Sequence, residues 1–255
     1  MTEHPLPSGD RRGELAARLE RVRGRIDAAA RNAGAVPPQL IAVTKYFPAD
    51  DVRLLAGLGV TDVGENKDQE ASAKAADVDD PGLRWHFIGQ LQTNKSRSVV
   101  RYAHAVHSVD RPGLVTALGK AMAAEQIRRD GQGQPPRPAL ECFLQVDLRT
   151  VRPADASGPA ARGGADPAGL TALADAVAAT EGLELRGLMA VAPLGEDPAD
   201  AFARLRELSD RLVADHPGAD RLSAGMSADL EAAVAHGATH LRIGSDILGP
   251  RPSLR

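Results

Sequence analysis

Residues 40–45 read LIAVTK, an apolar run that ends in a lysine. The pattern predicts a buried β-strand with Lys45 at its C-terminal tip, the end where barrels of parallel strands carry their chemistry. An amine that leaves an apolar strand loses part of its hydration, and this favours the neutral, nucleophilic form that condenses with an aldehyde to an imine. Taken alone, the position also fits a solvated charge at a strand edge.

Apolar runs of this kind recur along the chain and alternate with helical patterns. The eight predicted strands are Leu40–Lys45, Asp62–Asn66, Trp85–Gly89, Ala105–Asp110, Cys142–Leu148, Leu185–Pro193, Arg221–Gly225 and His240–Gly244. Amphipathic stretches are predicted near residues 49–58, 67–76, 91–101, 112–129, 168–180, 199–215 and 227–236, and a further helix over about 11–33. Continuous apolar strands between helices indicate a parallel sheet covered on its faces. Eight such units predict an α/β fold, a single (β/α)8 barrel of the TIM type with an extra N-terminal helix; a doubly wound open sheet is the alternative.

Length and composition fit this fold. With 255 residues, 43% of them hydrophobic, the chain suits one large α/β domain or two small ones, and no composition shift marks a boundary. We therefore expect a single domain over residues 1–255. Residues 1–10 are expected to be disordered, and residues 149–167, rich in Gly, Pro and Ala, are expected to form a mobile loop.

Charge and cysteine content exclude several classes of protein. The formal net charge of −3 provides no general attraction for nucleic acid or an anionic membrane. Cys142 is the only cysteine, so no disulfide framework is expected, and the seven histidines show no metal-binding spacing. The N-terminus lacks a signal pattern and no run approaches the length of a membrane span. We expect a cytoplasmic protein.

Two loops near the C-terminus have the features of a phosphate site. Residues 223–231 read SAGMSADLE, where Ser227 is expected to cap a helix whose first N–H groups remain free for an anion. Residues 242–249 read RIGSDILG, in which Gly244 allows close backbone approach and Ser245 can donate a hydrogen bond. Either loop alone also fits plain helix capping. In barrels, however, the loops after strands seven and eight commonly bind phosphate.

Two further polar residues are expected to face this mouth of the barrel. Asn66 closes the second predicted strand, and its amide could hold a ring hydroxyl or an imine nitrogen. Arg242 lies within the eighth predicted strand, on the same face as Gly244 because strand residues alternate. A charge inside a barrel needs a partner. An internal ion pair is therefore the alternative to a ligand-binding role for Arg242.

Together these motifs resemble a known family. The stretches WHFIGQLQTNK (85–95), IAVTK (41–45), GEN (64–66), LSAGMS (222–227) and RIGS (242–245) are similar to the pyridoxal phosphate homeostasis protein family (YggS/PROSC type) over about residues 11–250. The resemblance implies one alanine-racemase-like barrel that binds pyridoxal 5′-phosphate (PLP). It places Lys45 on the imine lysine and Asn66 on a cofactor-side asparagine. It places Arg242 on the arginine that faces the pyridine nitrogen, and it places Met226 with Ser227 and Gly244 with Ser245 on the phosphate loops.

The sequence departs from the family in two places. Ser245 stands where relatives often have threonine, which keeps the hydroxyl. The segment Arg149–Pro167 is longer than usual and carries Arg162-Gly163-Gly164 where relatives have a lysine-centred turn, so no cofactor contact is assigned to it.

Physical reasoning limits the chemistry of such a site. An arginine at the pyridine nitrogen disfavours its protonation and weakens the ring as an electron sink. A racemase also needs acid or base groups on both faces of the substrate carbon. Racemising fold relatives take one from a tyrosine in an additional β domain, whereas no such domain is expected here and the chain has only Tyr46 and Tyr102.

These features predict a PLP-binding protein without enzymatic activity. It would hold the cofactor as a lysine imine and hand it to PLP-dependent apoenzymes, in transient contacts, while the resemblance favours a monomer. A PLP-dependent amino-acid racemase is the first alternative. A lysine Schiff-base aldolase that needs no bound cofactor is the second.

Overall fold

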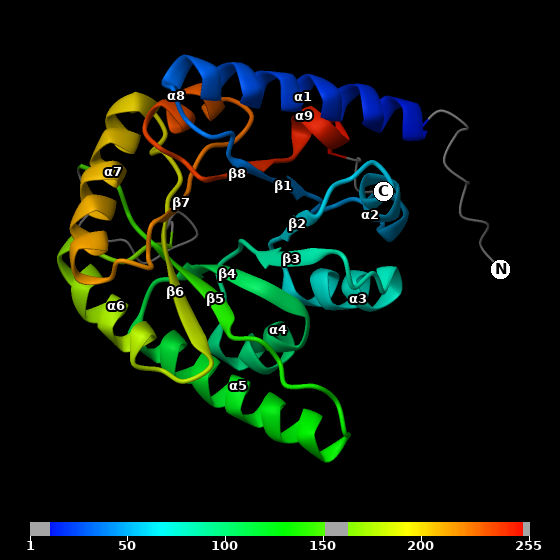
Figure 1. Ribbon diagram of the computed structural model, residues 1–255, viewed down its shortest axis with the longest axis vertical. Coiled ribbons are helices and arrows are strands. Elements are labelled where there is room, and N and C mark those ends of the chain that lie inside the picture. Colours follow the sequence, from blue (N-terminus) through cyan, green and yellow to red (C-terminus); the bar gives the residue numbers. More distant parts are fainter. Residues whose placement is uncertain (1–10, 151–162, 252–255) are drawn as a thin grey trace.

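The fold is a closed barrel of eight parallel strands in chain order, with β1 next to β8 (Figure 1). The computed structural model describes residues 11–150 and 163–251. The strands are β1 (Gln39–Val43), β2 (Asp62–Glu65), β3 (Arg84–Phe87), β4 (Ala103–Val109), β5 (Leu140–Gln145), β6 (Leu183–Met189), β7 (Arg221–Ser223) and β8 (His240–Ile243). The predicted TIM-type barrel is confirmed, and the open sheet is wrong because β1 and β8 pair directly.

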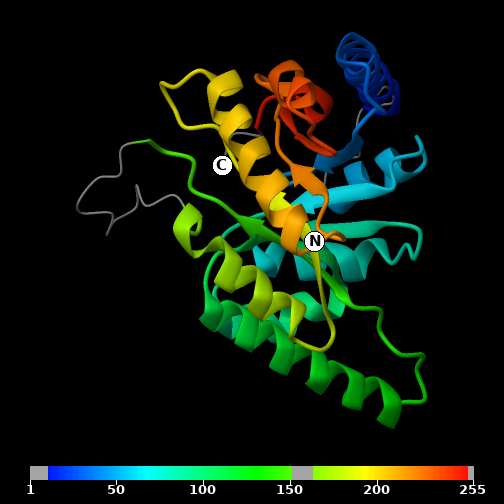
Figure 2. The same cartoon turned by 60° about the vertical axis from the view of Figure 1, so that its left-hand side comes forward.

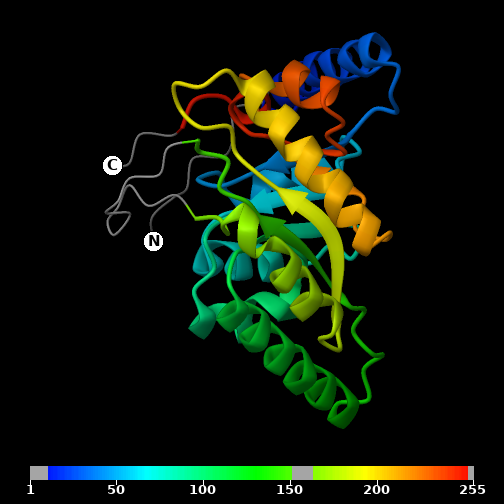
Figure 3. The ribbon, with the colours of Figure 1, turned by 90° about the vertical axis from the view of Figure 1, so that its left-hand side faces the viewer.

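Helices cover the outside of the barrel. They are α1 (Arg11–Ala33), α2 (Ala49–Ala56), α3 (Asp68–Val78), α4 (Ser96–Tyr102), α5 (Pro112–Gly131), α6 (Leu170–Ala178), α7 (Pro198–Asp215), α8 (Leu230–Ala235) and α9 (Ser245–Leu248). The extra N-terminal helix is present as α1, which packs against α8 and α9. The side views place α1 and α5 on opposite sides of the barrel (Figure 2, Figure 3). None of the described helices is long and apolar enough to cross a bilayer.

Strand ends differ most from the expectation. The sixth strand was expected to end at Pro193 but ends at Met189, and the first ends at Val43 instead of Lys45. Beyond each strand the chain continues to the mouth of the barrel, where Lys45 lines one cavity and Val191 and Pro193 line another. Residues 1–10 and 151–162, where disorder and a mobile loop are expected, lie outside the described residues. The single-domain organisation stays a prediction.

The barrel has an apolar outside and a largely polar centre. Between strands and helices lies a continuous core of buried apolar side chains, most of them aliphatic, together with the aromatic Trp85 and Phe87. The separate apolar cluster consists of only Ala105, Phe143 and Met189. Buried polar side chains accompany it on the strands: Asp62, His86, His107, Ser223, His240 and Arg242. Buried polar groups need hydrogen-bond partners, and all of these residues except His240 are hydrogen-bonded to one another.

Candidate cofactor site

A cavity of about 290 Å³ opens where strands β1, β7 and β8 end. Six of the seven residues expected to bind a cofactor line it, and the exception is Asn66. The six are Lys45, Met226, Ser227, Arg242, Gly244 and Ser245. The other lining residues are Val43, Tyr46, Phe47, Ile88, Ala228, Gly249 and Arg251. The cavity lies at the carboxyl ends of the strands, as expected for a barrel site.

Lys45 follows β1 by two residues. The chain stays attached to β2 beyond the strand, since the Thr44 N–H donates to the Gly64 carbonyl at 3.0 Å. Tyr46 then takes a left-handed conformation with φ +74°, which is strained for a non-glycine residue and frequent at functional sites. The Lys45 amine lies 5.9 Å from the Tyr46 ring centroid. It forms no ion pair with any carboxylate in the described part of the chain, so it is available to a ligand.

A buried ion pair between Glu65 and Lys74 holds the residue that precedes Lys45. Glu65 Oε1 accepts hydrogen bonds from Thr44 Oγ1 at 2.6 Å and from Lys74 Nζ at 2.5 Å. Lys74 also donates to the Thr44 carbonyl at 3.0 Å. The residue before Lys45 is therefore held through its side chain and its backbone. Nothing in the sequence pattern indicates this role of Lys74, because a lysine in a helical stretch is ordinarily solvated.

The two loops expected to bind phosphate, one with Ser227 and one with Ser245, contact each other. Ser227 Oγ and Ser245 Oγ lie 3.3 Å apart. The expectation that Ser227 caps a helix is wrong: α8 begins at Leu230, and Asp229 precedes it and accepts the Met226 N–H at 2.6 Å. Because Ser227 stands in the turn before the helix, its hydroxyl is not engaged in capping. A Cβ at Gly244 would lie only 3.3 Å from the Val43 carbonyl oxygen, so glycine allows this loop to approach β1.

Helix α1 holds both loops through one side chain. Arg25 forms an ion pair with Asp246 at 2.7 Å and another with Glu231 at 2.9 Å. Its Nη2 also donates to the Ser227 carbonyl at 3.0 Å. The extra N-terminal helix thus fixes the loop after β7 against the loop after β8. The sequence carried no signal for this, since 202 residues separate Arg25 from Ser227.

Arg242 is buried at the floor of the cavity, with 4% of its surface exposed. It donates to Ser223 Oγ at 2.7 Å and to the Ala190 carbonyl at 2.9 Å. No described carboxylate lies within ion-pair distance, so the internal ion pair considered from the sequence is wrong for the described residues. Burial lowers the pKa of Arg242 to about 10. The guanidinium therefore remains a cation at neutral pH.

Asn66 is not among the residues that line the cavity. Its Oδ1 is buried and has no hydrogen-bond partner in the described structure. Its backbone packs on Gly89, where any Cβ would collide with the Asn66 main chain. The glycine of the WHFIG stretch therefore positions Asn66. An unsatisfied buried amide oxygen is an acceptor that a donor group of a ligand could satisfy.

Comparison with known proteins gives the family. Residues 17–252 match the model of the alanine racemase N-terminal domain. The pyridoxal phosphate homeostasis protein of Mycobacterium tuberculosis is 42% identical over 95% of each chain. The protein of the same name from Pseudomonas aeruginosa is 43% identical over 93% of this chain and 96% of its own.

The chain belongs to the pyridoxal phosphate homeostasis protein family. Among solved structures, PipY of Synechococcus elongatus PCC7942 with PLP bound has a TM-score of 0.74 and 34% identity, covering 92% of this chain and 100% of that one. The resemblance to the pyridoxal phosphate homeostasis protein family seen in the sequence is confirmed.

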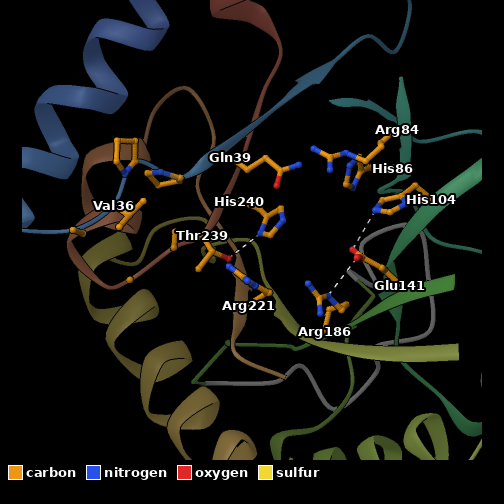
Figure 4. A pocket seen from close by; sticks show the side chains of 15 residues that line it. Val36, Gln39, Arg84, His86, His104, Glu141, Arg186, Arg221, Thr239 and His240 are labelled. Atoms are coloured by element: carbon orange, nitrogen blue, oxygen red, sulfur yellow. Dashed lines mark hydrogen bonds and ion pairs between the residues drawn. The ribbon is translucent and has the colours of Figure 1, made fainter. Parts of the chain in front are cut away.

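This family member has a second, larger cavity at the opposite mouth of the barrel. It measures about 450 Å³ and is lined by residues near the strand beginnings, among them Arg84, His104, Glu141, Arg221 and His240 (Figure 4). Its guanidinium groups already have carboxylate partners, such as Asp62 for Arg84 at 2.7 Å. The described residues contain no group of three or more His, Cys, Asp and Glu that could hold a metal ion.

Proposed function

We propose that this chain binds PLP reversibly as an imine with Lys45 and acts in intracellular PLP homeostasis by holding the cofactor and delivering it to apoenzymes. The observation that carries the proposal is the convergence of three features in one cavity. They are an amine without a carboxylate partner among the described residues, two hydroxyls 3.3 Å apart and a buried guanidinium.

The residues present fit PLP at both of its ends. A phosphate would accept hydrogen bonds from Ser227 and Ser245, and hydrogen bonds to a charged group are the stronger kind. Arg242 would donate to the pyridine nitrogen, and because a guanidinium does not release a proton, that nitrogen would remain unprotonated. When bound, PLP supplies an aldehyde and an electron-withdrawing ring. Lys45 would hold the aldehyde carbon, and we propose that Asn66, although it does not line the cavity, offers its unsatisfied Oδ1 to the bound cofactor.

The lining favours binding over catalysis. Among the described residues that form the cavity, none is Asp, Glu, His or Cys. Tyr46 does line the cavity, but it directly follows Lys45 in the chain, and Tyr102 lies elsewhere, donating to Asp68 at 3.4 Å. Racemisation needs proton-transfer groups on two faces of a carbon. We therefore propose a non-enzymatic role and keep the PLP-dependent racemase as the alternative.

An absorption spectrum tests the proposal. Protein loaded with PLP should show a visible imine band that disappears with hydroxylamine. A lysine Schiff-base aldolase would show no such band and would cleave a sugar phosphate instead. Loaded protein should restore activity to an apo-transaminase and should not racemise alanine or serine. Robust racemisation that Lys45→Ala abolishes would overturn the non-enzymatic role.

Partners, assembly and location complete the proposal. We expect a monomer that makes transient contacts with PLP-dependent apoenzymes, and light scattering in solution measures the mass. The net charge of −3 supports the absence of a nucleic-acid partner. The cytoplasmic location stays a prediction that fractionation of cells can check.

A further inference from the structure

A chain of hydrogen bonds crosses the interior of the barrel. Arg242 Nη1 donates to Ser223 Oγ at 2.7 Å, and Ser223 Oγ lies 2.8 Å from His107 Nδ1. His107 Nε2 lies 2.9 Å from His86 Nδ1, and His86 Nε2 lies 2.8 Å from Asp62 Oδ1. The five side chains come from β8, β7, β4, β3 and β2 and are all buried.

Each proton in this chain of hydrogen bonds can occupy only one position. The Asp62 carboxylate only accepts, so His86 donates through its Nε2–H, and a neutral His86 then accepts at Nδ1. His107 must therefore carry its proton on Nε2 and accept at Nδ1. Ser223 consequently donates its hydroxyl proton to His107, which leaves its oxygen lone pairs for Arg242. Every donor thus points from Arg242 towards Asp62.

The surroundings keep both histidines neutral. Burial lowers the pKa of His86 and lowers that of His107 well below the ordinary value. The other charged or titratable groups that face them are His104, Glu141 and His240, with Arg84 on Asp62. Burial would raise the pKa of Asp62, but hydrogen bonds from His86, Arg84 and Thr61 outweigh this and hold it below its ordinary range.

Packing fixes the ring in the middle of the chain. His107 stacks on Phe143 with ring centroids 4.3 Å apart and an interplanar angle of 12°. The far end reaches the second cavity, where His86 and Arg84 stand side by side in the wall (Figure 4). The chain therefore connects the floor of one mouth to the wall of the other.

We propose that Asp62, His86 and His107 are positioning residues for Arg242, a role that rests on PLP binding as proposed above. A guanidinium has five N–H groups, and Ser223 and the Ala190 carbonyl take one each. With His107 as acceptor, the Ser223 proton points away from Arg242 and cannot repel it. The guanidinium is thus held as a cation in one orientation, and its remaining N–H groups are available to a pyridine nitrogen in the cavity.

The tautomers of His86 and His107 can be measured in protein without bound cofactor. Nitrogen-15 NMR of labelled histidine should show His86 and His107 as neutral rings protonated at Nε2 between pH 6 and 8. A ring protonated at Nδ1, or a charged imidazolium at pH 7, would overturn the direction of the chain. This measurement does not depend on whether PLP binds.

The effect on the cofactor site is measured with two ligands and one matched pair of variants. Wild-type protein should prefer PLP over its analogue with C–H in place of the ring nitrogen. His107→Phe should reduce this preference about three- to tenfold, within the lower part of the range of coupling between groups in one network. His240→Phe removes a neighbouring buried histidine outside the chain and should leave the preference unchanged.

The remaining binding results distinguish a positioning role of His107 from a purely structural one. Equal weakening of both ligands by His107→Phe alone indicates a structural role and refutes the positioning role. If that variant does not fold, Asp62→Asn, whose side-chain NH2 can face His86 Nε2 and permit the opposite tautomer, should lower the same preference; an unchanged preference refutes the proposal. If wild-type protein binds neither ligand, the proposed function fails, whereas the NMR result still decides the direction of the chain.

Discussion

The hydroxyl oxygens of Ser227 and Ser245 lie 3.3 Å apart, although one belongs to the loop after β7 and the other begins α9. Parallel strands that are neighbours in a barrel bring their following loops together. Arg25 of α1 then holds both loops through Ser227 and Asp246. This pair is the part of the site best suited to a phosphate.

Removing both hydroxyls should weaken PLP but not pyridoxal. Ser227→Ala combined with Ser245→Ala is expected to cost PLP binding about 1–3 kcal/mol, the range for hydrogen bonds to a charged group. Pyridoxal, which lacks the phosphate, should bind both proteins alike. Titration followed by absorbance measures both affinities, and equal weakening of the two ligands would show that the hydroxyls only support the fold.

Lys45→Ala should eliminate the covalent adduct and leave the fold intact, because the amine makes no ion pair with a described residue. Lys67→Ala is the matched control, since Lys67 Nζ lies 5.7 Å and Lys45 Nζ 5.9 Å from the same Tyr46 ring centroid. Mass spectrometry after borohydride reduction detects the pyridoxyl group. A group mapped to another lysine in wild-type protein contradicts the assignment.

Arg25→Gln should weaken PLP about two- to fivefold, because partly exposed ion pairs contribute up to about 1 kcal/mol each. The loss arises from loosening of the Ser227 and Ser245 loops. Arg23→Gln serves as the control, since Arg23 lies on the same helix but donates to the carbonyls of Leu58 and Gly59. If both variants bind PLP as wild type does, α1 does not support the site.

Stability should fall as the pH drops from about 6.5 towards 4. Burial lowers the pKa of His240 to about 4 and also lowers that of His107. In this window the unfolded chain binds protons that the folded chain excludes, so the free energy of unfolding decreases on acidification. Each such group contributes about 1.4 kcal/mol per pH unit.

His107→Phe isolates one of these contributions. Urea unfolding at pH 7, 6 and 5 should give a shallower fall in stability for the variant than for wild type, by about 1.4 kcal/mol per pH unit. The slope is the quantity to compare, because the substitution also changes stability at pH 7. Identical slopes would show that His107 takes up its proton in the folded state as readily as in the unfolded chain.

Local patterns in the sequence predicted the strands, the helices and the positions of most site residues. The LIAVTK run places Lys45 just after β1, and the loop containing Ser227 and the loop containing Ser245 follow β7 and β8 as expected. Such patterns work because hydrophobic periodicity and turn residues act over a few neighbours in the chain. The cap was misassigned because Asp229, two residues further on, stands directly before α8.

The amino-acid sequence by itself therefore determined the order of strands, the closed barrel they favour and the mouth at which Lys45 lies. Only the tertiary structure decided which side chains meet: Ser227 with Ser245, Arg25 with both loops, and Arg242 with Asp62 through Ser223, His107 and His86. Closure of the barrel brings residues from distant strands within hydrogen-bond distance, and burial then requires each polar group to find a partner. Neither the closure of the barrel nor the pairing of its buried polar groups can be inferred from a short stretch of the sequence.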